Sequence, residues 1–106
     1  MNRVIDDKVR NFIPHELPLV TTLFLKRVSV DDDAVLQELF DVEDVAEMAE
    51  AFFRHFHIPA GDFSIESYYP WNGKSAFLYK RITQNKSPLM IRMFIESARA
   101  GRWLYK

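Results

Sequence analysis

The chain of 106 residues offers few side chains whose types and spacing favour metal binding. Asp31, Asp32 and Asp33 are consecutive, whereas a calcium loop needs alternating oxygen ligands, a glycine in mid-loop and a distal glutamate. The run is instead typical of helix capping or of a solvated surface. His55 and His57 are two residues apart, so on a helix they point in different directions and cannot share a metal ion unless the helix ends between them. We expect no metal site.

Nucleophilic and nucleotide-binding motifs are also missing from the sequence. The chain has no cysteine, which excludes disulfides, thiolate metal sites and cysteine nucleophiles. No G-x-S-x-G elbow, HExxH helix, Walker loop or G-x-G-x-x-G occurs. The carboxylates of the region 41–50 are expected on a solvated helix face, where general acid–base power is small. We therefore expect no catalytic residues, no cofactor and no enzyme activity, with an enzyme as the minor alternative.

Acidic and basic residues are divided unevenly along the chain, although the net charge is only −1. Residues 30–66 contain eleven acidic side chains and one basic, while residues 67–106 contain eight basic and one acidic. Either the two segments pack together and screen each other, or one of them attracts a partner of opposite charge. The near-zero total and the acidic middle segment disfavour a polyanion as that partner.

Helical spacing of apolar residues predicts two helices in the first half of the chain. The first covers residues 2–13 and should end at Pro14, because proline disrupts a helix interior. The second covers residues 42–57, with Asp41 as N-cap and Asp44 in the capping-box position three residues later. Its inward stripe should contain Val45, Met48, Ala49, Phe52 and Phe56, and its solvated side Glu43, Glu47 and Glu50.

A third helix is predicted near the C-terminal end. Ser87 is expected to cap it, Pro88 to occupy its first position and Gly101 to end it. Three charged residues on its outer face are expected to pair with one another at helical spacing: Arg92, Glu96 and Arg99.

The remaining segments give weaker signals. Residues 31–40 predict a short helical turn and residues 75–83 a short helix, while residues 15–30 fit either an extended segment or an irregular helix. Residues 63–66 and 102–105 leave room for a two-stranded β ribbon. We expect a single domain over residues 1–106, mainly α, with three to four helices.

Two stretches of the chain resemble known sequences. Residues 36–58, LQELFDVEDVAEMAEAFFRHFHI, are similar to the second helix of acyl carrier proteins and its preceding loop. The fuller resemblance is to a family of small uncharacterised, acyl-carrier-like proteins of enterobacteria, through Tyr68-Tyr69-Pro70 and the segment SPLMIRMFIESARAGRW at 87–103. The resemblance implies an acyl-carrier-like fold of three to four helices and no established activity.

The sequence lacks the residue that carrier function requires. A carrier protein attaches phosphopantetheine to a serine at the start of its second helix, but no serine or threonine occurs between Ser29 and Ser64. Val42, or Asp41 with a one-residue shift, stands at the corresponding position. The acidic helix face remains, and in carrier proteins that face binds basic patches on their enzymes.

We therefore expect a non-catalytic interaction or regulatory module that binds a basic protein surface through Glu43, Asp44, Glu47 and Glu50. One alternative is an immunity- or antitoxin-type binder. Another, less favoured, is a nucleic-acid-binding protein that uses the basic aromatic C-terminal third, with Lys80, Arg81, Lys86, Arg99 and Arg102. Without a signal peptide or a membrane-spanning run, a cytoplasmic protein is expected. Partner identity and oligomeric state stay open.

Overall fold

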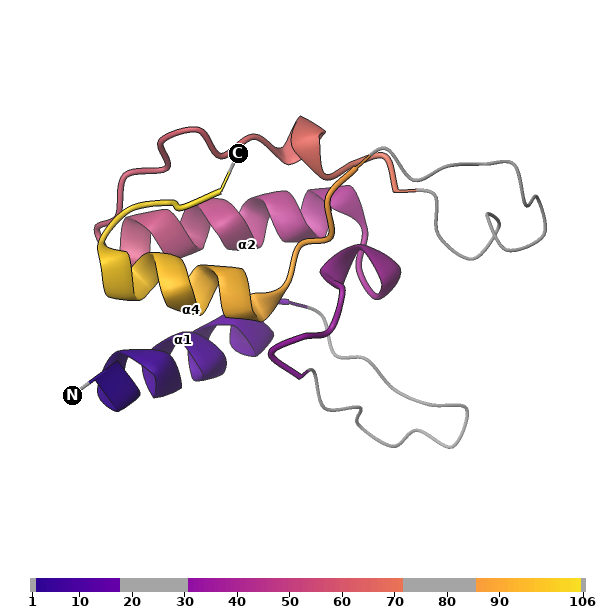
Figure 1. Ribbon diagram of the computed structural model, residues 1–106. Coiled ribbons are helices and arrows are strands. Elements are labelled where there is room, and N and C mark those ends of the chain that lie inside the picture. Colours follow the sequence, from indigo (N-terminus) through magenta and orange to yellow (C-terminus); the bar gives the residue numbers. More distant parts are fainter. Residues whose placement is uncertain (1, 18–30, 72–85, 106) are drawn as a thin grey trace, which may run out of the picture.

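The computed structural model describes residues 2–17, 31–71 and 86–105, and these residues are mainly helical (Figure 1). Helix α1 packs against both α4 and α2, and α4 lies between the other two helices in the view of Figure 1. This confirms the predicted fold class, a small α structure. The elements in chain order are α1 (Asn2–Glu16), η1 (Leu36–Glu38), α2 (Val42–His55), η2 (Ile65–Ser67) and α4 (Ile91–Ala100).

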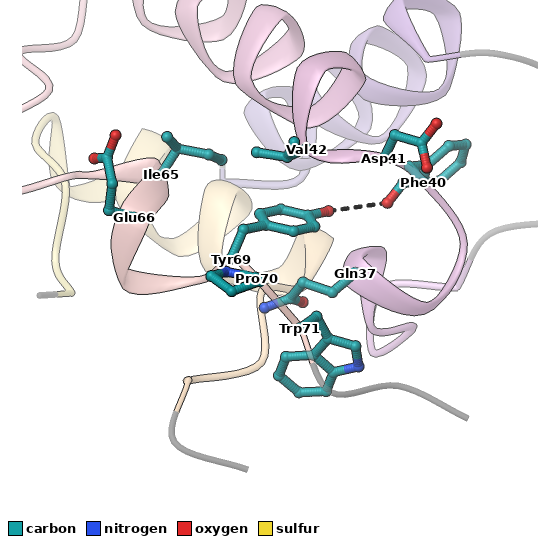
Figure 2. Close-up of a pocket in the computed structure, with 9 residues that line it drawn as sticks. All are labelled: Gln37, Phe40, Asp41, Val42, Ile65, Glu66, Tyr69, Pro70 and Trp71. Atoms are coloured by element: carbon teal, nitrogen blue, oxygen red, sulfur yellow. Dashed lines mark hydrogen bonds between the residues drawn. The ribbon is translucent and has the colours of Figure 1, made fainter. Parts of the chain in front are cut away.

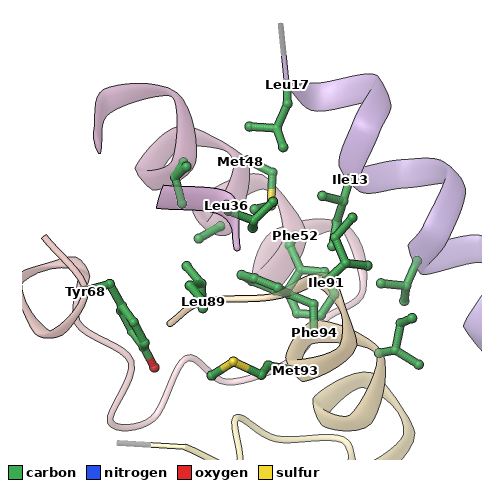
Figure 3. Packing of buried hydrophobic residues seen from close by; sticks show 14 of the residues in the cluster. Ile13, Leu17, Leu36, Met48, Phe52, Tyr68, Leu89, Ile91, Met93 and Phe94 are labelled. Carbon is green, nitrogen blue, oxygen red and sulfur yellow. The ribbon is translucent and has the colours of Figure 1, made fainter. Parts of the chain in front are cut away.

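The apolar stripes of the three helices meet in one core (Figure 3). The predicted stripe of α2 is buried except for Phe56, which is half-buried. Phe52 of α2 and Phe94 of α4 are fully buried, and their ring centroids lie 5.0 Å apart in an edge-to-face arrangement. Such aromatic pairs stabilise a core beyond the effect of buried area alone. Val9 and Ile13 place α1 on the same core.

Two predicted helix boundaries are wrong because tertiary contacts override local signals. Helix α1 does not end at Pro14 but continues to Glu16, since Ile13 and Leu17 on either side of the proline are buried in the core. Helix α4 begins at Ile91, after Met90 as N-cap. Ser87 and Pro88 therefore precede the helix, in an extended segment that bonds to residues 35–37.

The other helix ends agree more closely with the sequence. Asp41 is the N-cap residue of α2, as predicted, although its side chain makes no capping hydrogen bond. Helix α2 ends at His55 rather than His57, which adopts a left-handed conformation at φ 55°. Gly101 ends α4 as predicted, with φ 78°. The N–H of Arg102 donates to the Ser97 carbonyl at 3.2 Å and satisfies one of the last carbonyls of the helix.

The β ribbon considered from sequence is not formed, because the parts of the chain that the structure describes contain no strand. Residues 65–67 make the 3₁₀ turn η2 instead, and the buried Trp103 packs on Phe63 with ring centroids 5.0 Å apart. An isolated antiparallel bridge joins Val35 to Met90. The predicted turn within 31–40 is present as η1. The helix predicted at 75–83 and nearly all of 15–30 lie outside the described residues.

The side chain of Gln37 joins three separate segments of the chain. It is only 7% exposed. Its Nε2 donates to the carbonyl of Ser87 at 2.6 Å and to that of Tyr68 at 3.3 Å, and its Oε1 accepts from the N–H of Leu89 at 2.7 Å. These backbone groups lie in irregular segments and have no helical partner, so one buried amide satisfies all three.

Two aspartates of the run 31–33, Asp32 and Asp33, bind arginines of two helices. The Asp33 carboxylate accepts two hydrogen bonds from Arg92, at 2.5 and 2.9 Å. Asp32 accepts from Arg10 at 3.0 and 3.1 Å, and its carbonyl accepts from the backbone N–H of Arg92 at 2.9 Å. The run therefore helps to cap α4 from a distant position in the sequence.

A further ion pair joins the first and last helices. Asp6 of α1 is buried and pairs with Arg99 of α4, whose Nε lies 2.7 Å from Oδ1. The outer residues of α4 were expected to pair with one another, and that prediction is wrong: both arginines bind aspartates of other segments, and Glu96 accepts a hydrogen bond from Tyr105. Acidic and basic segments thus do pack together, at least at these contacts.

Gln37→Leu is expected to destabilise the protein by about 2–4 kcal/mol, because it leaves the buried Tyr68 carbonyl, the buried Leu89 N–H and the part-buried Ser87 carbonyl without partners. The measurement is the free energy of unfolding in urea. Glu38→Leu changes the neighbouring exposed residue and should alter that free energy by no more than about 0.5 kcal/mol. Equal effects of the two substitutions would contradict the role given to Gln37.

Stability should depend on the ionisation of Asp6. The hydrogen bond from Arg99 lowers the pKa of its carboxyl below the ordinary value of 3.8. The ionised form therefore favours the folded state above that value, and this contribution is lost as pH falls through the lower folded-state pKa. Asp6→Asn should lower the melting temperature at pH 7, and the difference from the unsubstituted protein should shrink as the pH falls below 4.

The control for this experiment is Asp7→Asn in the same helix, because the Asp7 side chain is 60% exposed. It should lower the melting temperature at pH 7 by much less. A difference between Asp6→Asn and the unsubstituted protein that persisted unchanged into acid would show that charge at Asp6 is unimportant.

Candidate docking site on helix α2

The predicted partner-binding residues lie on the solvated side of α2. Glu43, Glu47 and Glu50 are exposed, and Asp44 is half-buried. Glu50 lies 3.5 Å from Arg54, and both side chains are more than 70% exposed, so this pair contributes little stability. Within the described residues, the other three carboxylates make no ion pair. The structure thus places Glu43, Glu47 and Glu50 together on one exposed side of α2.

A pocket of about 480 Å³ opens at the N-terminal end of the same helix (Figure 2). Val42 is the first residue of α2, Phe40 and Asp41 come directly before it, and η1 contributes Gln37. The remaining wall comes from η2 and the segment after it: Ile65, Glu66, Tyr69, Pro70 and Trp71. Apolar side chains make most of the wall, and the two carboxylates belong to exposed residues.

Tyr69 fixes the shape of the pocket and stays protonated. Its hydroxyl donates to the Phe40 carbonyl at 3.1 Å, which ties the segment after η2 to the start of α2 (Figure 2). Burial raises the pKa of the Tyr69 phenol, and the nearby carboxylates of Asp41 and Asp44 raise it further. The phenol is therefore neutral at ordinary pH, and the negative field of both carboxylates reaches the pocket.

Glu66 is the other acidic residue that lines the pocket, besides Asp41. Its carboxylate accepts a hydrogen bond from the Ser64 hydroxyl at 2.6 Å, and this bond is the main cause that lowers its pKa. A smaller effect comes from the charge of Lys86, whose ammonium donates to the Glu66 backbone carbonyl at 2.8 Å. The Glu66 carboxylate is consequently ionised at neutral pH.

The electrostatics of the pocket favour cations. A helix N-terminus carries about half a positive charge from its dipole, but Asp41, Glu43 and Asp44 all lie at this end of α2. Together with Glu66, these carboxylates carry more negative charge than the dipole and the neighbouring Lys86 carry positive charge. The pocket can therefore accept an apolar group with positive neighbours more readily than an anion.

The described members of the alternative nucleic-acid set lie at the two ends of α4. Lys86 precedes the N-terminal end of α4, whereas Arg99 and Arg102 lie at its other end, and ten helical residues span about 15 Å. Arg99 is paired with Asp6. Lys80 and Arg81, the other two residues of the set, lie outside the described residues.

The histidines gather around Phe12 of α1. His55 stacks on the Phe12 ring with centroids 4.6 Å apart, and His15 and His57 line hollows beside it. Helix α2 does end at His55, which is the condition that a metal ion shared by His55 and His57 requires. Even so, the described residues contain no group of three or more His, Asp or Glu side chains suited to holding one.

Sequence reasoning identified the acidic face but missed the pocket. Nothing in the spacing of Gln37, Tyr69 and Trp71 indicated that they are neighbours in the fold. The one available hint was that Tyr68-Tyr69-Pro70 takes part in the family resemblance. That resemblance marks the segment but does not indicate that it lines a pocket. As for membranes, no helix among the described residues has the length and apolar character needed to cross a bilayer.

Comparison with known proteins supplies a family and no activity. No curated protein and no solved structure matches the chain significantly. A family model described as a protein of unknown function, DUF1493, matches residues 2–106. Because that match covers nearly the whole sequence, the chain belongs to the DUF1493 family of proteins of unknown function.

Proposed function

We propose that this protein is a non-catalytic interaction module whose acidic α2 face binds a basic surface of another protein. The observation that carries the proposal is the exposure of Glu43, Glu47 and Glu50 along one side of a helix whose other side is buried. Electrostatic attraction of this kind accelerates encounter with a partner and selects against partners of the same charge.

The acidic residues of the protein divide into two groups with different surroundings. Asp6, Asp32 and Asp33 each bind an arginine and hold separate segments together. The carboxylates of α2, in contrast, contribute little to such contacts, since the weak Glu50–Arg54 pair is the one ion pair they make among the described residues. Charges that the fold does not use are the ones available for binding.

The resemblance to acyl carrier proteins supports the same proposal. In carriers, the corresponding acidic helix binds basic patches on enzymes, and here the helix begins with Asp41 and Val42 in place of the modified serine. The proposal is therefore an acyl-carrier-like docking helix without a prosthetic group, in a cytoplasmic protein. Immunity- and antitoxin-type binders would be members of the same broad class.

The proposal can be tested with a triple charge reversal, Glu43→Lys with Glu47→Lys and Glu50→Lys. The protein is used to capture partners from a nuclease-treated native lysate at low and moderate salt. Basic proteins that the unsubstituted protein captures should be lost with this variant, because attraction becomes repulsion. The measurement is quantitative mass spectrometry of the bound proteins. Circular dichroism should show that the variant keeps its helices.

A matched control changes the net charge by the same amount elsewhere. Glu16, Asp31 and Asp62 are exposed, and their combined reversal to lysine should leave the captured proteins unchanged. If the two triple variants lose the same partners, the binding depends on overall charge and not on the α2 face. Retention of every partner by the α2 variant would refute the proposal.

A further inference from the structure

We propose that the pocket at the N-terminal end of α2 receives one large apolar side chain of the partner, and that the acidic face binds the lysines or arginines next to it. The partner is then a basic peptide segment with a single aromatic or aliphatic anchor. This inference rests on the proposed function and specifies the kind of segment that the acidic face binds.

The walls of the pocket are suited to an apolar anchor. Val42 is 39% exposed although it is an apolar residue, and it faces the same hollow as the rings of Tyr69 and Trp71 (Figure 2). The volume of about 480 Å³ lies within the range of about 300–1,000 Å³ that is usual for ligand pockets. Buried aromatic anchors in such pockets dominate the energy of many interfaces.

The pocket is held open by contacts that exist without a ligand. The Tyr69 hydroxyl is bound to the Phe40 carbonyl, and Gln37 is fixed by three hydrogen bonds to backbone groups. Walls that are fixed in advance reduce the entropy lost on binding, so more of the contact energy appears as affinity.

Charge complementarity identifies the rest of the partner. Asp41 and Glu66 lie at the pocket, and Glu43 and Glu47 continue the negative surface along α2. A lone apolar group would gain nothing from these carboxylates, and an anionic group would be repelled by them. A segment with positive charges beside its anchor satisfies both parts of the surface.

The helix geometry also sets the spacing in the partner. Residues 42 to 50 rise about 12 Å along the axis at 1.5 Å per residue. An extended peptide covers that distance with about four residues at 3.3 Å each. The positive residues should therefore lie within about four positions of the anchor.

The test uses a display library of random twelve-residue peptides, selected on the full-length protein. Enriched peptides should contain a Trp, Phe, Tyr, Leu or Met within four positions of two or more Lys or Arg residues. A synthetic peptide of the enriched sequence should bind at least tenfold more weakly when its anchor is replaced by alanine, as measured by fluorescence anisotropy.

Two substitutions in the protein separate the pocket from the acidic face. Val42→Trp fills the pocket mouth at an exposed position, and Trp71→Ala removes part of its wall; neither changes the charge. Each should weaken binding of the synthetic peptide at least tenfold, whereas the control with Glu16, Asp31 and Asp62 reversed to lysine should change it less than twofold. Two variants are used because either one alone could disturb folding.

The outcomes distinguish failure of this inference from failure of the proposed function. Enriched basic peptides without a preferred apolar position, or binding unaffected by both pocket variants, would overturn the inference and leave the acidic face as a docking surface. No enrichment of basic residues would overturn both. Sedimentation velocity that showed a dimer dissociated by Val42→Trp would identify a second copy of the chain as the occupant, and the inference would be wrong.

Discussion

The arrangement of this protein depends on the three hydrogen bonds of Gln37. The amide joins η1 to the segments that contain Tyr68 and Leu89, and none of these segments has a regular ladder of its own. A buried polar group stabilises a fold when every one of its bonds is made, and it then specifies one arrangement over others of similar hydrophobic burial. The same amide lines the pocket, so the contact that fixes the irregular segments also fixes the candidate site.

Acidic residues have two separate roles in this chain. Those near α1 and α4 form bidentate or buried contacts with arginine, in which the geometry of the guanidinium matches the carboxylate. Glu43, Glu47 and Glu50 on α2 remain in water, where a charge costs little to maintain and adds little to stability. The acidic residues of the sequence therefore include some that hold segments together and others that make little contribution to the fold. Composition alone does not separate the two groups.

The helices could be predicted from sequence far better than their junctions and the pocket. The stripe of α2 repeats with the period of a helix, so local spacing was sufficient. The helix boundaries at Pro14 and Ser87 differ from the prediction because burial of neighbouring residues and pairing with a distant segment outweigh local preferences. The pocket lining comes from segments separated by some thirty residues, as Phe40 and Tyr69 show, and nothing periodic in the sequence relates them.

The capping of α4 by the aspartate run has a consequence for the order of folding. A helix of ten residues is marginal by itself in water, and its Arg92 is held by Asp33 from 59 positions earlier. The last helix therefore gains stability only after a large loop has closed, a step whose entropy cost slows assembly. Folding of this small helical protein should consequently be more cooperative, and slower, than its helix content suggests, with α4 consolidating together with α1 rather than before it.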